Sequence, residues 1–184
     1  MNVANKLTIL RILLIPFFIV TFYIPWTYWY WPATLLFVIA FATDMLDGYL
    51  ARSRNMVTNF GKFMDPIADK LLTMTALVML TAKGMLSPVI IIIILGREFI
   101  VSGLRLVAAG NGKVIAAGWL GKAKTMAQFI MLLFLLLRPV LEKMLGMGGA
   151  AVLIGILVAV ATLLTVWSGW DYVWANRNFI NPNK

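Results

Sequence analysis

Six long apolar segments, separated by polar residues, glycine or proline, make up most of this 184-residue chain. They run over residues 7–24, 33–54, 66–83, 88–109, 121–137 and 148–174. A helix that crosses a bilayer needs roughly 20 predominantly apolar residues and satisfies its backbone hydrogen bonds internally. The segments therefore predict an all-α, polytopic membrane protein with six transmembrane helices, which form a single domain over residues 1–184.

Composition favours a membrane protein over a soluble one. Hydrophobic residues make up 62% of the chain and charged residues only 12%, whereas soluble domains carry about 25% charged residues. The formal net charge is +9, but basic residues between membrane spans more often set topology or meet anionic lipid than bind nucleic acid. We therefore expect no nucleic-acid partner. The chain has neither cysteine nor histidine, so any metal must be bound through oxygen, which excludes the usual zinc and copper sites.

Basic residues are distributed unevenly between the two ends of the predicted helices. One end carries Lys83, Arg138 and Lys143. The other end carries Lys6, Arg11, Arg52, Arg54, Lys62, Arg105, Lys113, Lys122, Lys124, Arg177 and Lys184. Because cytoplasmic ends carry the excess of lysine and arginine, both termini are expected to be cytoplasmic. Four aromatic residues near the C-terminus are interpreted as anchors at that membrane interface: Trp167, Trp170, Tyr172 and Trp174.

Four of the seven acidic residues fall in one stretch, Asp44-x2-Asp47-Gly48-x2-Ala51-Arg52-x8-Gly61-x3-Asp65-x3-Asp69. A charged side chain in a membrane-spanning helix costs roughly 2.5–3.5 kcal/mol, so four together need a compensating partner. Helical spacing puts the first two aspartates on one shared face and the last two on another. The second predicted helix runs inward and the third outward, so both pairs are expected at a similar depth near the cytoplasmic face. Two facing pairs suit one or two hard cations such as Mg²⁺ or Mn²⁺.

The residues between the aspartates fit a phosphate-bearing ligand. Gly48 and Gly61 leave room beside the metals, and Arg52 offers a fork that can bind phosphate. Each piece has a plainer interpretation: Asp65 before Pro66 could be a helix N-cap, and the first aspartate pair could meet a basic residue of another helix. The glycines could serve helix packing, and the arginine could be a topology anchor. The occurrence of the aspartates, the glycines and the arginine together, at this spacing, favours a metal-dependent site.

The complete pattern resembles the signature of the CDP-alcohol phosphotransferases, and every position of it is filled. By that resemblance, two metal ions are held by the aspartates, mainly Asp44, Asp47 and Asp65, and a CDP-linked lipid binds across the second and third helices. The phosphatidyl group passes to an alcohol, and CMP is released. The resemblance assigns Asp69 as the base that deprotonates the attacking hydroxyl; it could act as base, as metal ligand or as both. Contacts with the CDP-lipid are implied for Gly48, Arg52, Thr58 and Gly61.

A second group of charged residues narrows the acceptor alcohol. Arg97 and Arg105, and Lys122 and Lys124, lie toward the cytoplasmic ends of the fourth and fifth predicted helices. Glu98 is an expected partner for one of these cations. A positive pocket suits an acceptor that carries phosphate and would repel an amine such as choline. The plainer interpretation is topology and lipid contact, but Arg97 is set back inside an apolar helix, where a cation needs a purpose.

The stretches 5–16, 97–105 and 121–128 are similar to the bacterial members of the family that use sn-glycerol 3-phosphate. This resemblance implies CDP-diacylglycerol as donor and phosphatidylglycerophosphate as product, in anionic phospholipid biosynthesis. It places the acceptor phosphate on the four basic residues, and it suggests a homodimer in the bacterial inner membrane with the active site facing the cytoplasm. The alternatives are another acceptor (an inositol phosphate, serine or phosphatidylglycerol) and, more remotely, a cation transporter that uses the aspartates as its ion site.

Overall fold

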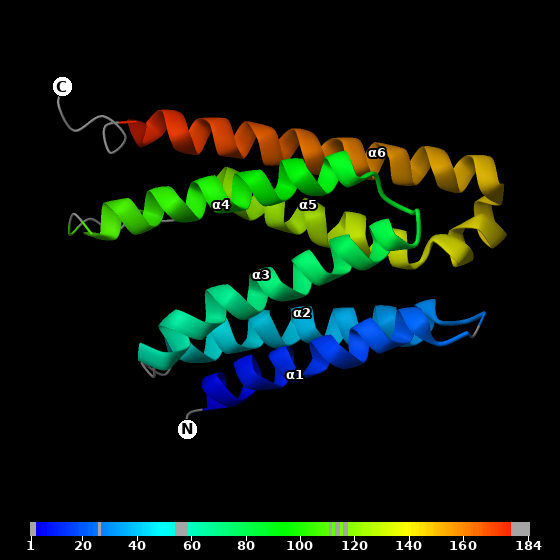
Figure 1. Ribbon diagram of the computed structural model, residues 1–184, viewed down its shortest axis with the longest axis horizontal. Helices are drawn as coiled ribbons and strands as arrows, with labels where there is room; N and C mark the ends of the chain where they lie inside the picture. Colours follow the sequence, from blue (N-terminus) through cyan, green and yellow to red (C-terminus); the bar gives the residue numbers. More distant parts are fainter. Residues whose placement is uncertain are drawn as a thin grey trace.

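The computed structural model describes residues 3–25, 27–53, 59–110, 112, 115 and 118–177. Within these ranges, the side chains of residues 3–6, 44–53, 59–63, 65, 66 and 69 are not described. The regular elements of the described part are six α-helices (Figure 1): α1 (Val3–Tyr23), α2 (Tyr30–Ser53), α3 (Asn59–Ala82), α4 (Pro88–Gly110), α5 (Trp119–Leu136) and α6 (Arg138–Ala175). The prediction of an all-α fold is therefore confirmed for the described residues.

The helices run up and down along one common direction (Figure 1). At one end of the bundle α1 begins, α2 ends, α3 begins, α4 ends, α5 begins and α6 ends; we call it the terminal end. The connections from α1 to α2, from α3 to α4 and from α5 to α6 lie at the opposite end, which we call the distal end. An even number of alternating helices thus brings the start of α1 and the end of α6 to the same end of the bundle.

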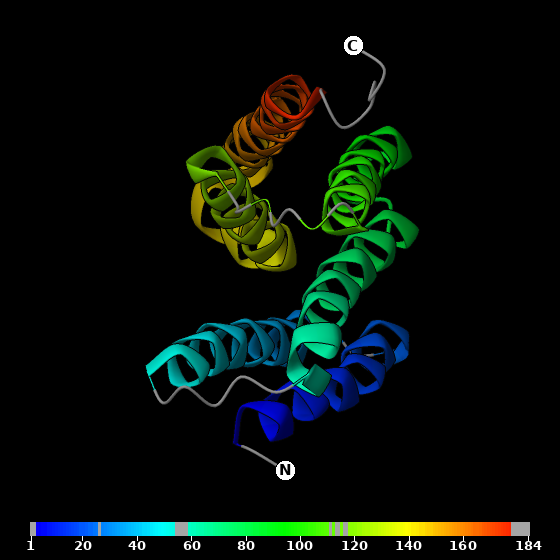
Figure 2. The ribbon, with the colours of Figure 1, turned by 90° about the vertical axis from the view of Figure 1, so that its left-hand side faces the viewer.

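The six helices form two groups, which Figure 2 shows from the terminal end. In one group α1 packs against α2 and α3, and in the other α6 packs against α4 and α5. Aromatic stacking joins the groups, because Phe37 and Phe41 of α2 stack on Phe129 of α5 with ring centroids 5.6 and 3.7 Å apart. Buried leucines of α3 and α5 continue this core toward the distal end, among them Leu77, Leu80, Leu132 and Leu135.

Two prolines lie inside helices, although a proline in the sequence often marks the end of a helix. Pro16 lies inside α1, and α3 begins at Asn59, seven residues before Pro66. The predicted start of this helix at residue 66 is therefore wrong, as is the alternative that Asp65 caps it. A proline removes one backbone donor and disturbs the carbonyl four residues earlier, a local cost that packing in a bundle can offset.

The last helix also begins earlier than the apolar pattern predicts. It starts at Arg138 rather than at residue 148, because Pro139 occupies the first turn, where the missing N–H has no intrahelical partner to lose. Gly146, with φ 72° and ψ 166°, then separates a short helical segment at residues 138–145 from the long segment that follows. Such a conformation is essentially restricted to glycine.

Two of the described helices, α5 and α6, combine the length and the apolar composition needed to cross a membrane. Shorter apolar runs occupy Leu7–Tyr23 in α1, Tyr30–Thr43 in α2 and Lys70–Ala82 in α3. Asp44 and Asp47 lie in the half of α2 nearer the terminal end, and Asp65 and Asp69 lie in the corresponding half of α3. The charged stretch therefore lies toward the terminal end of both helices, and the apolar runs lie beyond it.

A candidate active site at the terminal half of the bundle

The four aspartates of the predicted metal site lie on α2 and α3. Asp47 lies six positions before the last residue of α2, and Asp65 lies six positions after the first residue of α3. Asp44 and Asp69 lie about one turn further from the terminal end. Since an α-helix rises about 1.5 Å per residue, the two pairs lie at a similar level on two antiparallel helices. Their side chains lie outside the described part of the structure, so metal binding stays a prediction.

The residues expected to contact the CDP-lipid lie nearer the terminal end. Gly48 and Arg52 belong to the last two turns of α2, and Gly61 belongs to the first turn of α3. Only the helical backbone is described at these three positions. Thr58 lies outside the described residues. Their predicted contacts are therefore untested.

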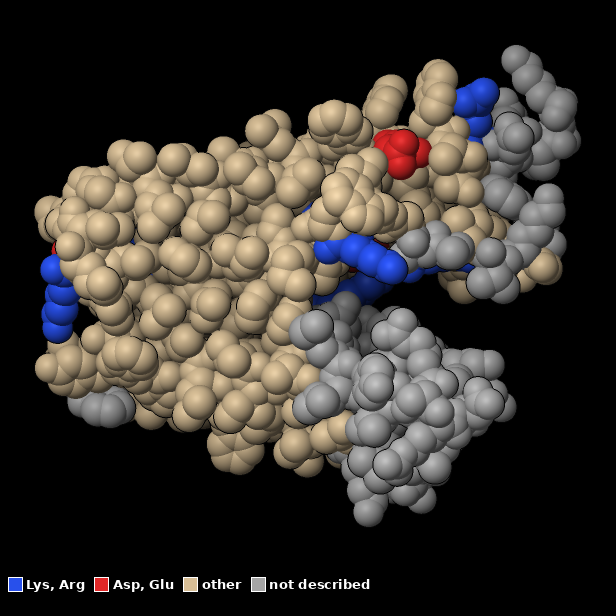
Figure 3. Space-filling model, turned by 180° about the vertical axis from the view of Figure 1, so that it is seen from behind, with Lys and Arg blue, Asp and Glu red and all other residues tan. Residues whose placement is uncertain are grey.

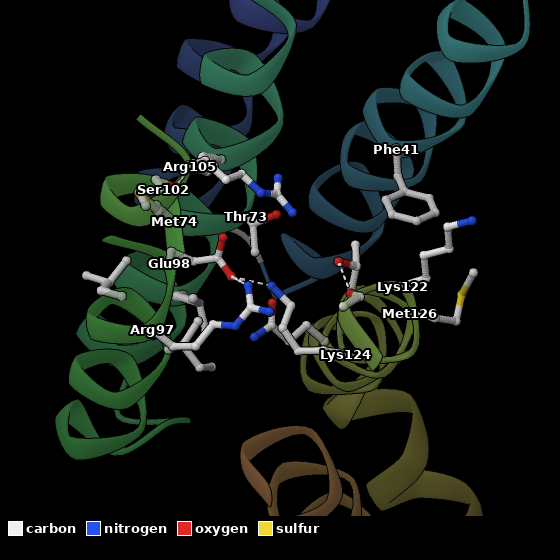
Figure 4. A pocket seen from close by; sticks show the side chains of 17 residues that line it. Phe41, Thr73, Met74, Arg97, Glu98, Ser102, Arg105, Lys122, Lys124 and Met126 are labelled. Carbon is white, nitrogen blue, oxygen red and sulfur yellow. Dashed lines mark hydrogen bonds and ion pairs between the residues drawn. The ribbon is translucent and has the colours of Figure 1, made fainter. Parts of the chain in front are cut away.

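A cavity of about 570 Å³ opens between α2, α3, α4 and α5. All four cations predicted to bind the acceptor phosphate line it: Arg97 and Arg105 from α4, and Lys122 and Lys124 from α5 (Figure 4). In a view from behind, lysine and arginine side chains gather in a recess that opens toward the terminal end (Figure 3). The structure thus brings together four residues that are up to 27 positions apart in the chain. Their role in binding phosphate stays a prediction.

The α2 and α3 walls of this cavity lie within one helical turn of the aspartates. Phe41 lines the cavity from α2, three positions before Asp44. Lys70 and Thr73 line it from α3, one and four positions after Asp69. Residues three or four positions apart lie on one face of a helix. The basic cavity therefore lies next to the helical segments that carry the aspartates.

Glu98 pairs with two of the four cations. Its carboxylate accepts a hydrogen bond from Nη1 of Arg97 at 3.2 Å and forms an ion pair with Nζ of Lys124 (Figure 4). The three side chains are only 11% (Arg97), 6% (Lys124) and 17% (Glu98) exposed. A charge removed from water in this way is tolerated when it is paired, so each partner stabilises the others at this depth. The expectation that Glu98 partners one cation is confirmed, and it partners a second as well.

The other two cations are more accessible. Nε of Arg105 donates a hydrogen bond to the hydroxyl oxygen of Tyr172 on α6 at 3.1 Å, and its guanidinium lies 5.4 Å from the centre of that ring. Lys122 is exposed, and Figure 4 shows its side chain pointing away from Glu98. Of the four predicted phosphate-binding cations, two are therefore held by an internal carboxylate, and two can be reached more directly by an incoming anion.

Three cavity residues have contacts that sequence reasoning did not assign. Lys70 donates a hydrogen bond to Ser102, which links α3 to α4. The buried Gln128 amide donates to Thr165 of α6 at 2.9 Å. A signal existed for Lys70, since it is a cation well inside an apolar helix and next to Asp69. No comparable signal marks Thr165, whose role depends on a contact between two helices.

Known proteins resemble this chain over nearly its whole length. The family model described as CDP-alcohol phosphatidyltransferase matches residues 1–167. A CDP-diacylglycerol–glycerol-3-phosphate 3-phosphatidyltransferase of Bacillus subtilis (strain 168) is 42% identical, with 93% of each chain covered. Proteins of the same description from Escherichia coli (strain K12) and Shigella flexneri serotype 5b (strain 8401) are 40% and 39% identical over 96% of this chain and 95% of theirs. With the aspartate pattern complete and the likeness extending over nearly all of its length, the chain belongs to the CDP-alcohol phosphatidyltransferase family.

Proposed function

We propose that this protein transfers the phosphatidyl group of CDP-diacylglycerol to sn-glycerol 3-phosphate, giving phosphatidylglycerophosphate and CMP. The observation that carries the proposal is the basic cavity, which lies within one turn of the aspartate stretch on both α2 and α3. Relatives about 40% identical over almost the whole chain are described as enzymes with this donor and this acceptor. The proposal accounts for both halves of the site, one for each substrate.

The charge of the cavity suits a phosphorylated acceptor. Its described lining includes five cations, namely Lys70 and the four predicted phosphate-binding residues, and one carboxylate, Glu98. The excess positive charge favours a dianionic phosphate and disfavours an amine such as choline or ethanolamine. Serine carries no phosphate and gains nothing from these cations. A volume of about 570 Å³ lies within the usual range of ligand pockets, roughly 300–1,000 Å³.

The aspartate stretch suits the donor and the chemistry of transfer. Its donor set consists of carboxylate oxygens in a chain without cysteine or histidine, which fits Mg²⁺ or Mn²⁺. Asp44, Asp47 and Asp65 would hold the ions, with Asp69 as a further ligand or as the base. Bound metal would neutralise the pyrophosphate and the charge that develops during transfer. Contacts with CDP would come from Gly48, Arg52, Thr58 and Gly61.

The protein chain itself has two tasks in the reaction. The basic cavity would hold the acceptor phosphate and so direct the hydroxyl at the other end of glycerol 3-phosphate toward the aspartates. Asp69 would take the proton of that hydroxyl as its oxygen bonds to the phosphatidyl phosphorus. The bond from this phosphorus to CMP breaks, and CMP leaves with the electron pair.

We place all six helices across the bacterial inner membrane, with both termini and the site on the cytoplasmic side. The shortest helix, α5, has 18 residues, so each helix is at least about 27 Å long, close to the roughly 30 Å of a hydrocarbon core. The described basic residues support the orientation, because Arg105, Lys122, Lys124 and Arg177 lie toward the terminal end. A homodimer stays part of the proposal on family resemblance alone.

An acceptor panel tests the proposed function. Purified protein is given CDP-diacylglycerol with glycerol 3-phosphate, inositol phosphate, serine or phosphatidylglycerol, and CMP release is measured. We expect release with glycerol 3-phosphate, its loss on chelation of divalent metal, and its return with added Mg²⁺ or Mn²⁺. Release with another acceptor but not with glycerol 3-phosphate would contradict the assignment. Ion uptake into liposomes that lack CDP-lipid, lost on Asp65→Asn, would instead support the transporter alternative.

A further inference from the structure

One face of α6 contacts three polar residues that line the cavity. Thr165, Gly169 and Tyr172 are four and three positions apart, which is the spacing of a single helical face. Each of them meets a different cavity residue on α4 or α5. We call these three residues the α6 stripe. Two of its members, Gly169 and Tyr172, lie beyond residue 167, where the family match ends.

Tyr172 fixes one end of the Arg105 guanidinium. The tyrosine is buried, and its hydroxyl oxygen accepts a hydrogen bond from Nε of Arg105 at 3.1 Å. Because this bond uses Nε, the two terminal nitrogens of the guanidinium are left for a ligand in the cavity. These nitrogens form the fork that binds phosphate through two parallel hydrogen bonds. The contact therefore orients Arg105 without occupying its phosphate-binding groups.

Gly169 provides the space in which the Arg97 side chain lies. A Cβ atom at this position would lie 2.9 Å from Cγ of Arg97 and 3.8 Å from its Cβ. Cγ is near the root of the side chain, so it cannot give way without moving the guanidinium. On the other side, a Cβ atom on Gly121 of α5 would lie 3.9 Å from Nη2 of Arg97. Arg97 thus lies between the backbones of α5 and α6.

Thr165 orients Gln128 through a directional pair of hydrogen bonds. Its buried hydroxyl donates to the Ala161 carbonyl oxygen at 2.6 Å, so it can only accept from the Gln128 amide nitrogen at 2.9 Å. The Gln128 amide is therefore fixed with its nitrogen toward α6. Each member of the α6 stripe thus meets one cavity side chain: Tyr172 and Thr165 through a hydrogen bond, and Gly169 by leaving space for it.

We propose that the α6 stripe is a positioning layer for the acceptor-phosphate site, in which Tyr172 orients Arg105 and Gly169 accommodates Arg97. The inference rests on the proposed function, because it takes the ligand of these arginines to be the phosphate of glycerol 3-phosphate. Long arginine side chains lose conformational freedom when they bind a ligand, and holding them in place beforehand reduces that cost. The stripe therefore acts on acceptor affinity through the arginines, and the contacts described for it are to Arg97, Arg105 and Gln128.

The first test is Tyr172→Phe, which keeps the ring and removes the hydroxyl. We expect the KM for glycerol 3-phosphate to rise roughly three- to tenfold, while the KM for CDP-diacylglycerol stays within twofold of wild type. The same substitution is then made in an Arg105→Lys background. Lysine has no planar guanidinium fork for the hydroxyl to orient, so Tyr172→Phe should add no further increase there. Such non-additivity is a readout that general destabilisation would not produce.

The second test is Gly169→Ala, with Gly155→Ala as its matched control. Gly155 is an exposed glycine of the same helix, and a Cβ atom there would have no neighbour within 4 Å. Displacing Arg97 should lower kcat/KM for glycerol 3-phosphate on the order of tenfold, whereas the control should match wild type. Thermal unfolding of both variants in detergent identifies any loss of folding. If Gly169→Ala does not fold, the positioning role is judged from the Tyr172→Phe result.

The outcomes separate the inference from the function on which it rests. Failure of the wild-type protein to release CMP with glycerol 3-phosphate overturns the proposed function, and the inference with it. If the wild type is active, equal increases in both KM values for Tyr172→Phe overturn the positioning role alone. An additive effect of Tyr172→Phe in the Arg105→Lys background does the same.

Discussion

At the scale of single residues, the candidate site contains cations in two different states. Arg97 and Lys124 share the Glu98 carboxylate, while Arg105 and Lys122 are exposed to the cavity. An arriving phosphate meets positive charge that a carboxylate already partly neutralises at the first two cations but not at the second two. The exposed cations are therefore expected to contribute more to the initial capture of the acceptor.

Lys122→Ala tests this division. Loss of an accessible ammonium should raise the KM for glycerol 3-phosphate about tenfold, the cost of one hydrogen bond to a charged group. The KM for CDP-diacylglycerol should change much less, because the donor is proposed to bind across α2 and α3. Lys143→Ala, at the distal end, is the control and should leave both values unchanged. Equal effects of Lys122→Ala on both substrates would argue against an acceptor pocket.

Asp69→Asn tests the assignment of the base. The amide is close in size to the carboxylate but cannot take a proton, so CMP release should fall by roughly a hundredfold or more. Binding of CDP-diacylglycerol, measured by calorimetry in detergent, should be largely retained. A comparable loss of donor binding or of folding would show that Asp69 serves mainly as a ligand or in the structure.

Which site residues could be predicted depended on how unusual they are in their segment. Arg97 stood out as a cation inside an apolar helix, and its neighbour Glu98 was expected to pair with a cation. Tyr172 did not stand out, because three exposed tryptophans surround it in sequence and all four were interpreted as interface anchors. Its burial against Arg105 results from the packing of α6 on α4, which spacing within one segment does not encode. The same holds for Gly169.

At the scale of elements, the apolar pattern located all six helices but not all of their ends. The two largest errors are at the start of α3, by seven residues, and at the start of α6, by ten residues, and in each case a proline lies within or beside the missed segment. A proline is compatible with a first turn, with a helix end and, in a packed bundle, with a helix interior. Its sequence position alone does not distinguish these cases, because the outcome depends on neighbouring helices.

Gly146→Ala tests the break within α6. At φ 72° and ψ 166° a side chain is strained, so the variant should lose roughly 1–3 kcal/mol of stability and unfold at a lower temperature. Gly148→Ala, two positions later, is the matched control. That glycine is helical, and a Cβ atom added to it would have no neighbour within 4 Å, so alanine there should be neutral or slightly stabilising. Equal midpoints for the two variants would show that the break tolerates a side chain.

At the scale of the whole molecule, two groups of helices meet around the site. The group of α1, α2 and α3 carries the aspartates, and the group of α4, α5 and α6 carries the four predicted phosphate-binding cations and the residues that hold them. The two substrates are therefore assigned mainly to different groups. The start of α1 and the end of α6 lie at the end of the bundle toward which the recess opens.

Cysteine labelling tests the proposed membrane orientation, because the chain has no cysteine of its own. Arg177→Cys places a thiol at the terminal end, and Thr27→Cys places one in the exposed connection between α1 and α2 at the distal end. A membrane-impermeant maleimide should label Thr27→Cys in spheroplasts but label Arg177→Cys only after the membrane is opened. The reverse pattern would place the site on the outer side.

The pairing of Glu98 with Arg97 and Lys124 is also expected to affect product release. The acceptor phosphate is still present in phosphatidylglycerophosphate, so the attraction that captured it persists after the reaction. If Glu98 pairs again with Arg97 and Lys124 after the reaction, it would weaken the binding of the product phosphate and speed product release. Glu98→Gln should then lower the KM for glycerol 3-phosphate and also lower kcat, with a burst of CMP in the first turnover. A higher KM at unchanged kcat would contradict this counter-ion exchange.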